Sequence, residues 1–184
     1  MKKWLKRIGV VVAAVILLPV LALLALSLRP GAGRMQASAE IQALPETLWT
    51  WLDDGSRLKQ WVSWTENVTP WSPQAGVGAK RSLTMRDENN GGMLMTIETA
   101  CTEYTPPKTL SLHMTTAGEF EGQQTYRLTD LGSGRTRIEV SSSFHFSNPM
   151  IQLLEPLVTP SARKKLEGDV ARLKTLVESQ AELR

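Results

Sequence analysis

The sequence is poor in the side chains that most often carry chemistry. Its 184 residues include one cysteine, two histidines and two tyrosines. A single cysteine excludes an intrachain disulfide, and Cys101 is expected to be a small buried core residue. Two histidines and one cysteine cannot complete a four-ligand zinc site without carboxylates, and the HExxH and CxxC spacings are absent. The sequence also lacks the Gly-x-Ser-x-Gly motif and a phosphate-binding glycine loop, so we expect no metal, no cofactor and no catalytic residue set.

Negative charge is missing from the first 29 residues, which contain five lysines and arginines. The whole chain has a formal net charge of +3, from 21 basic and 18 acidic residues. The rest of the chain therefore holds 16 basic residues against the same 18 acids, a net charge of −2. Because it also lacks a basic stripe, nucleic-acid binding is disfavoured.

Residues 8–28 form a run of 21 residues without a charge, and 14 of them are valine, isoleucine or leucine. At about 1.5 Å per residue, such a helix spans about 30 Å, the thickness of the hydrocarbon core of a bilayer. The run predicts one transmembrane helix that follows a basic flank at residues 1–7. A cleaved signal peptide is the alternative, but it requires a shorter apolar core and a nearby small-residue cleavage site.

The flanking charges predict the orientation of this helix. Four basic side chains and the terminal amine precede it, whereas Arg29 and Arg34 follow it. The positive-inside rule then places the N-terminus in the cytoplasm. We expect a single-pass protein of the cell membrane whose folded domain is extracytoplasmic, in the periplasm if the source is a Gram-negative bacterium. Residues 29–34 form a short linker that keeps the domain close to the bilayer.

Residues 35–184 have the pattern of one α+β domain. Alternation predicts a strand from Met35, and two short helices follow at residues 45–52 and 56–61. Turn signals at residues 87–92, 105–108, 117–118 and 130–134 then separate a run of antiparallel strands that ends near Ser147. This gives a sheet of about six to seven strands in total. After two prolines, an apolar stripe predicts a long amphipathic helix from Ser161 to the end. The economical arrangement wraps the apolar face of a curved antiparallel sheet around this helix.

Seven segments of the chain follow one another in a recognisable order: Ala39–Trp49, Leu58–Trp61, Gly76–Ala79, Thr102–Leu110, Thr125–Thr129, Asn148–Met150 and the closing helix from Leu166 to Val177. These segments resemble the SRPBCC superfamily, the helix-grip fold of START lipid-transfer domains, plant pollen-allergen relatives and bacterial polyketide cyclase/dehydrase-like proteins. The resemblance covers residues 36–177 in order and spacing. It implies an elongated, mostly apolar cavity between the sheet and the C-terminal helix, but it names no ligand.

The strand alternation and the helix stripe together predict which side chains line that cavity. Most are apolar, and Thr99, Tyr126 and Ser142 are expected to orient the polar end of a ligand. The predicted lining consists of Trp61, Leu83, Met85, Met93, Met95, Ile97, Thr99, Leu112, Met114, Tyr126, Ile138, Val140, Ser142, Phe144, Leu166, Val170 and Leu173.

Five tryptophans lie within 23 residues, from Trp49 to Trp71. They are expected to anchor the short helices on the sheet, or to line the mouth of the cavity or the headgroup region of the membrane. Trp49 and Trp51 lie about 200° apart around a helix, so the pattern predicts that they do not both face the core.

We predict a membrane-anchored binding module for a hydrophobic small molecule or lipid. One alternative is a polyketide cyclase or dehydratase acting on an aromatic or polyketide-type substrate, which requires a titratable group inside the cavity. The sequence places His113 and His145 on the outer face, and it puts Glu98 and Glu103 on opposite faces of one strand. A second alternative is a non-enzymatic interaction domain whose cavity is filled by its own side chains.

Overall fold

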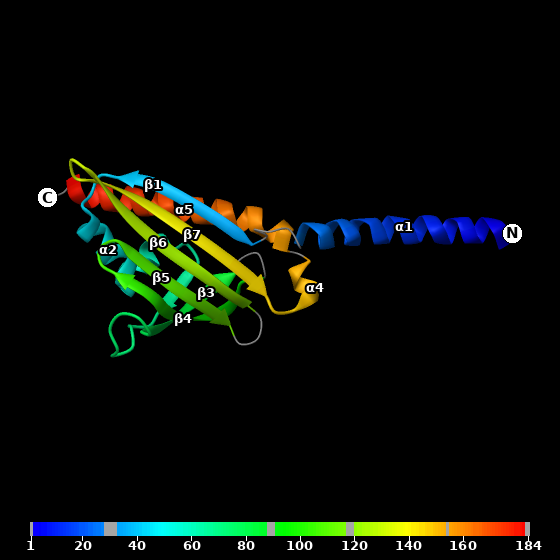
Figure 1. The fold of residues 1–184 in the computed structure, drawn as a ribbon, viewed down its shortest axis with the longest axis horizontal. Helices are drawn as coiled ribbons and strands as arrows, with labels where there is room; N and C mark the ends of the chain where they lie inside the picture. Colours follow the sequence, from blue (N-terminus) through cyan, green and yellow to red (C-terminus); the bar gives the residue numbers. More distant parts are fainter. Residues whose placement is uncertain (1, 28–32, 88–90, 117–119, 154, 183–184) are drawn as a thin grey trace.

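The computed structural model describes residues 2–27, 33–87, 91–116, 120–153 and 155–182. Outside this part lie Leu28, which ends the predicted transmembrane run, residues 29–32 of the predicted linker and the last two residues of the chain. Helix α1 is followed by a strand, two short helices, six further strands and two closing helices (Figure 1). The elements are α1 (Lys2–Ser27), β1 (Arg34–Ile41), α2 (Pro45–Asp53), α3 (Gly55–Trp61), β2 (Thr65–Val68), β3 (Lys80–Asp87), β4 (Met93–Thr105), β5 (Thr109–Thr116), β6 (Phe120–Gly132), β7 (Arg135–Phe146), α4 (Pro149–Gln152) and α5 (Glu155–Glu182).

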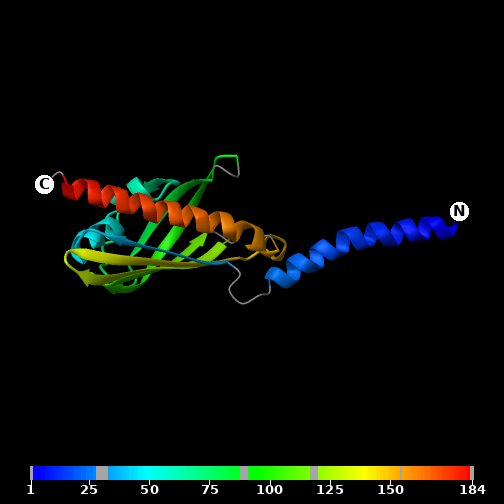
Figure 2. The same ribbon diagram turned by 90° about the horizontal axis from the view of Figure 1, so that it is seen from above.

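The seven strands form one antiparallel sheet in the order β1-β7-β6-β5-β4-β3-β2. The sheet curls around one side of α5, as the turned view shows (Figure 2). Register pairs Leu83 with Ile97, and Ile138 with Leu128, so the apolar side chains of neighbouring strands share one face. The predicted α+β helix-grip fold and the predicted alternation are confirmed.

The core lies between this inner face and α5. Leu110, Ile138 and Val140 are fully buried on the strands, and Leu173 is fully buried on the helix. Cys101 is a buried member of the same cluster, as predicted. Burial raises the pKa of its thiol, which donates a hydrogen bond to the carbonyl oxygen of Glu103 at 3.3 Å.

Trp49 and Trp51 of α2 are both buried, with 8% and 1% of their surfaces exposed, so the prediction that only one faces the core is wrong. The prediction assumed that only one side of α2 is buried, whereas other elements pack against two sides of this helix. The ring of Trp49 packs edge-on against Tyr104 of β4, with 5.4 Å between the centroids. The indole N–H of Trp61, on α3, donates to the backbone carbonyl of Trp51 at 3.1 Å.

Helix α5 begins at Glu155, six residues before the predicted start at Ser161. The prediction treated Pro156 and Pro160 as interruptions. Pro156 lies in the first turn, where a helix needs no backbone N–H, and Pro160 lies one turn further on. The Thr159 hydroxyl donates to the carbonyl of Glu155 at 2.7 Å within this stretch. Two prolines close to a helix start are therefore compatible with a continuous helix.

Strand β2 was not singled out by the sequence, because it is four residues long and lies at the edge of the sheet. The hairpin at residues 105–108 is confirmed, and the amide of Lys108 donates to the Thr105 carbonyl at 2.6 Å. The β6–β7 hairpin turns through Ser133 and Gly134, both with positive φ. The central residues of the other two predicted turns lie in the undescribed segments 88–90 and 117–119.

Helix α1 contains a 20-residue stretch, Arg7–Leu26, that is long and apolar enough to cross a membrane. None of this stretch is buried against the rest of the chain. A membrane span and a signal sequence both have these properties. The C-terminal end of α1 lies beside α4 and the start of α5, and α1 contacts α5 (Figures 1 and 2).

Candidate ligand-binding site

The inner face of the sheet changes from closed to open along its length. At the end near α2 it is sealed, and Leu110 and Ile138 are completely buried. Towards the end near α1, the inner-facing Met85, Met95 and Met114 are half-buried. The inner face is therefore an apolar surface that the chain covers only in part.

The 17 predicted lining residues fall into three groups by burial. Met93, at the start of β4, is 63% exposed. Leu83, Met85, Met95 and Met114 are half-buried. The buried ones are Trp61, Ile97, Thr99, Leu112, Tyr126, Ile138, Val140, Ser142, Phe144, Leu166, Val170 and Leu173. The strand residues of the set share the inner face and the helix residues belong to the core beneath α5, but contact with a ligand stays a prediction.

Three phenylalanines meet near the open end of the inner face. The ring centroids of Phe120, Phe144 and Phe146 lie 5.7 to 6.2 Å apart. Phe144 is buried, whereas Phe120 and Phe146 are half-buried. The predicted lining included Phe144 alone. The pairing of β6 with β7, which places Phe120 opposite Phe146, joins the three into one aromatic cluster.

A pair of polar side chains lies in the middle of the inner face. The amide N–H of Gln124 donates to the Tyr126 hydroxyl at 2.7 Å. Tyr126 is buried, and burial raises the pKa of its phenol, so the hydroxyl is neutral at physiological pH. Of the other two predicted polar residues, Thr99 donates to the Arg81 carbonyl at 2.9 Å, and Ser142 is buried.

Arg81 is a buried cation that the sequence reasoning missed. Only 3% of it is exposed, and its guanidinium lies 4.0 Å from the centre of the Trp71 ring. It donates to the backbone carbonyls of Asp53 at 3.0 Å and Leu52 at 3.4 Å, at the C-terminal end of α2. Burial lowers the pKa of Arg81. A signal existed, because the alternation that directs Leu83 inward also directs Arg81 inward.

The Asp53 side chain completes a hydrogen-bonded group with Arg81. It accepts from the Trp71 indole N–H at 3.0 Å and from the Tyr104 hydroxyl at 3.2 Å. Burial raises the pKa of the Tyr104 phenol. The group joins α2, β3, β4 and the loop around Trp71, so its clearest role is to fix α2 on the sheet.

Asp169 is a second buried charged residue that the sequence did not reveal. It lies on α5 between Leu166 and Val170 and accepts from the backbone N–H of Ser63 at 3.1 Å. Burial raises the pKa of its carboxyl group. The position beside two stripe residues was the available signal, since the 3.6-residue period turns residue 169 toward the same side.

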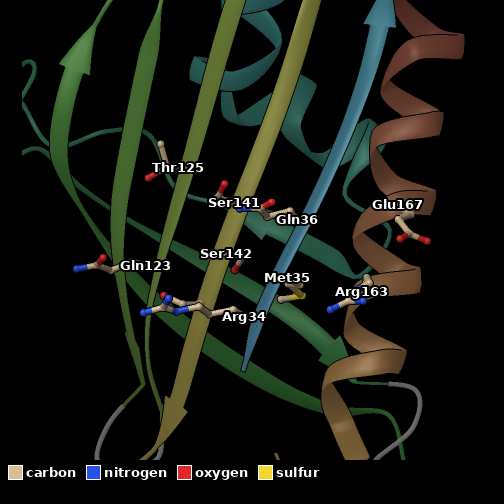
Figure 3. Close-up of a pocket in the computed structure, with 10 residues that line it drawn as sticks. Arg34, Met35, Gln36, Gln123, Thr125, Ser141, Ser142, Arg163 and Glu167 are labelled. Carbon is tan, nitrogen blue, oxygen red and sulfur yellow. The ribbon is translucent and has the colours of Figure 1, made fainter. Parts of the chain in front are cut away.

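A separate hollow of about 630 Å³ lies along α5 and over those halves of β1, β6 and β7 that are nearer to α1. Of the predicted lining residues, Ser142 also borders this hollow. Arg34 extends from β1 toward β6, whereas Arg163 and Glu167 project from α5 on the other side of β1 (Figure 3). Its lining is mostly polar, so this hollow is not the predicted apolar cavity. The residues around it are Arg34, Met35, Gln36, Gln123, Thr125, Ser141, Ser142, Ser143, Arg163 and Glu167.

The titratable groups proposed for the cyclase alternative all lie on the outer surface. Glu98 accepts from the Ser82 hydroxyl, and Glu103 accepts from the Ser111 hydroxyl. A β-bulge after Cys101 turns Glu103 outward, so its predicted place on the face opposite Glu98 is wrong.

Both histidines point outward as predicted. His113 pairs with Glu121 at 2.9 Å, and His145 lies 3.3 Å from the Glu155 carboxylate. Within the described segments, no cluster of three or more His, Cys, Asp or Glu side chains is arranged to hold a metal ion. The cyclase alternative therefore loses the proton carriers that the sequence had suggested for it.

Solved structures share this architecture at low sequence identity. The protein TTHA0849 of Thermus thermophilus aligns with a TM-score of 0.66 and 16% identity, over 80% of this chain and 98% of that one. The Zhui aromatase/cyclase of a Streptomyces species aligns with a TM-score of 0.66 and 13% identity, over 80% and 94% of the two chains. A conserved protein of Geobacillus kaustophilus aligns with a TM-score of 0.64 and 12% identity, over 78% and 94%. These similarities confirm the fold.

Among curated proteins, no sequence match is found. One family model, described as polyketide cyclase / dehydrase and lipid transport, matches residues 32–178. That match spans the strands, the short helices and nearly all of α5, and leaves α1 outside. The resemblance to the SRPBCC superfamily is thereby confirmed, and the chain belongs to the polyketide cyclase / dehydrase and lipid transport family.

Proposed function

We propose that this protein is a membrane-anchored binding module that takes up a hydrophobic small molecule or a lipid between the inner face of its sheet and α5. The observation that carries the proposal is the open half of the inner face. There, Met85, Met95 and Met114 are half-buried on three adjacent strands. Apolar surface exposed in this way costs free energy, at about 25 cal/mol for each Å², until another apolar surface covers it.

The chemistry of this surface favours an apolar ligand of variable shape. Methionine side chains are flexible and polarizable, so they adapt to ligands of different outline. The aromatic cluster of Phe120, Phe144 and Phe146 extends the surface across β6 and β7. Gln124 is half-buried beside the Tyr126 hydroxyl and supplies a donor for the polar end of a ligand. A few polar groups among apolar walls are typical of small-molecule sites.

The proposed anchor is α1, retained as an uncleaved single-pass span. Its N-terminus would lie in the cytoplasm and the folded domain outside it, in the periplasm of a Gram-negative bacterium. The basic residues before the span support this orientation, and the length of Arg7–Leu26 supports the span itself. The membrane would be both the attachment site and the nearest source of a hydrophobic ligand.

Native mass spectrometry of the full chain in detergent tests the binding proposal. The chain is delipidated, incubated with a bacterial lipid extract and released from detergent in the spectrometer. We expect a discrete bound species on the wild type. Met95→Trp fills the open inner face and should reduce that species several-fold.

A matched variant separates binding on the inner face from lipid that adheres to α1. Thr96→Trp adds the same ring to the exposed outer face of β4 and should leave the bound species unchanged. The amount of lipid that adheres to α1 should be equal in the wild type, Met95→Trp and Thr96→Trp. Binding that is absent from the wild type, or equal in Met95→Trp and wild type, overturns the proposal.

A further inference from the structure

Most of the large apolar side chains that are exposed outside α1 lie at one end of the domain. Two are exposed elsewhere, Leu44 after β1 and Val77 in the loop before β3. The other five exposed among the described residues are Met93, Leu94, Ile151, Leu157 and Val158, which we call the apolar rim.

The apolar rim combines three segments that are far apart in the sequence. Met93 and Leu94 begin β4, Ile151 lies on α4, and Leu157 and Val158 lie in the first turns of α5. The strand register places the start of β4 at the same end of the sheet as the end of β7, which α4 follows. Strand β1 also begins at this end, because Arg34 pairs with Ser143 near the end of β7. Figures 1 and 2 both show α4 and the start of α5 at the end of the domain that faces α1.

The chain itself brings this end close to the end of α1. Six residues connect Ser27 of α1 to Arg34 of β1. A connection of that length reaches at most about 20 Å. Helix α1 also contacts α5. If α1 crosses a bilayer, the rim therefore lies within reach of the surface of that same bilayer.

Positive side chains lie at the start of β1 and in α5, C-terminal to the rim residues of that helix. Arg34, Arg163 and Lys164 form no ion pair with any carboxylate in the described part of the chain. Arg34 and Arg163 border the polar hollow, and Glu167 is the one acid among the described residues that line it. Apolar side chains at the tip with cations behind them match the order of hydrocarbon and anionic headgroups in a membrane.

We infer that the apolar rim docks on an anionic phospholipid bilayer, with its five side chains in the interface and the three cations among the headgroups. The docking rests on the proposed function, because it takes the bilayer to be the one that α1 crosses. It directs the open half of the inner face, with Met85, Met95 and Met114, toward the membrane. A lipid would then pass between bilayer and inner face without crossing bulk water.

Spin labels on the full chain in vesicles of phosphatidylglycerol and phosphatidylcholine test the docking. In a Cys101→Ala background, a nitroxide is attached at Leu157→Cys or at Met93→Cys. The controls are Leu44→Cys and Val77→Cys, which replace equally exposed apolar residues away from the rim. A fifth label at Val15→Cys reports on α1. The readout is the ratio of collisions with oxygen to collisions with a water-soluble nickel complex.

We expect this ratio to be several-fold higher at residues 157 and 93 than at residues 44 and 77. Replacing Arg34 and Arg163 with glutamine should lower it at residue 157. If the collision ratio is that of a water-exposed label at residues 157 and 93 but that of a membrane-embedded label at residue 15, the docking is overturned and the anchor is left intact. An aqueous value at 15 overturns the anchor of the proposed function instead. Spin–spin broadening at 157 would assign the rim to a second copy of the chain and also overturn the docking.

Discussion

Arg81 places a positive charge at the C-terminal end of α2, where backbone carbonyl groups lack partners within the helix. Its guanidinium donates to the carbonyls of Leu52 and Asp53 and stacks on Trp71. A cation in this position interacts favourably with the helix dipole. The Nε atom of Arg81 is buried without a hydrogen-bond partner, which is the cost of packing the side chain here.

Replacing Arg81 with methionine should lower the free energy of unfolding by about 2 to 4 kcal/mol, because buried carbonyl groups lose their donors. Urea unfolding of the full chain in detergent, followed by tryptophan fluorescence, measures this. Arg137→Met is the control, since Arg137 forms an exposed pair with Glu40 at 2.7 Å and should change stability little. Equal stability of the two variants would contradict a structural role for Arg81.

Asp169 should make stability depend on pH. Burial raises the pKa of Asp169 in the folded state, so the folded chain binds the proton more tightly than the unfolded chain. The stability from this group is present below its unfolded pKa of about 3.9 and is lost as the pH rises through the folded value. Asp169→Asn keeps an acceptor for the Ser63 amide and should raise the Tm at pH 7 by about 2 to 4 °C.

This gain in Tm should shrink as the pH is lowered toward 4, where the wild-type carboxyl group becomes protonated. Thermal unfolding of both proteins in detergent across this range provides the test. Glu167→Gln, on the exposed side of the same helix, should show no such trend. A gain for Asp169→Asn that is constant across the range would show that the carboxyl group is not the cause.

At the scale of elements, α5 has two halves with different surroundings. Leu166, Val170, Leu173 and Val177 are buried against the sheet and the short helices. In its first turns, by contrast, Leu157 is 60% exposed. The apolar residues from Leu166 onward contribute to folding, and those of the first turns are available for a partner.

Leu173→Ala should therefore lower the free energy of unfolding by about 2 to 5 kcal/mol, the usual cost of removing a buried leucine side chain. Leu157→Ala should change it by less than about 0.5 kcal/mol, as is usual for an exposed site. Urea unfolding in detergent compares the two alanine variants on one helix. A large loss for Leu157→Ala would place that residue in the core and remove the basis for the apolar rim.

Local patterns predicted most elements, and the exceptions have identifiable causes. The alternation of β3 to β7 survives in the structure because one face of the sheet is buried. Strand β2 has too few residues for alternation to be recognised. The start of α5 was placed too late because prolines near a helix start are compatible with the helix. The position of Glu103 was wrong because a bulge changes which face a residue occupies.

At the scale of the whole molecule, the proposed anchor α1 would determine in which compartment the domain lies. If α1 is an uncleaved anchor with a cytoplasmic N-terminus, alkaline phosphatase fused after Arg184 should be active in a Gram-negative host. Green fluorescent protein fused at the same place should be dark. The intact mass of the extracted protein should correspond to all 184 residues. Inverted reporter activities would reverse the orientation, and a mass that lacks residues 1–28 would show cleavage of a signal peptide.

The sequence alone determined the apolar run near the N-terminus, the separation of charge from the rest of the chain, the alternation of the sheet and the membership of the family. All of these depend on residues close together in the chain or on their order. The tertiary structure decided which end of the inner face is open, which carbonyl groups accept from Arg81 and that Met93, Ile151 and Leu157 share one end of the domain. Strand register and the path of α5 bring these distant residues together, and no local pattern contains that information.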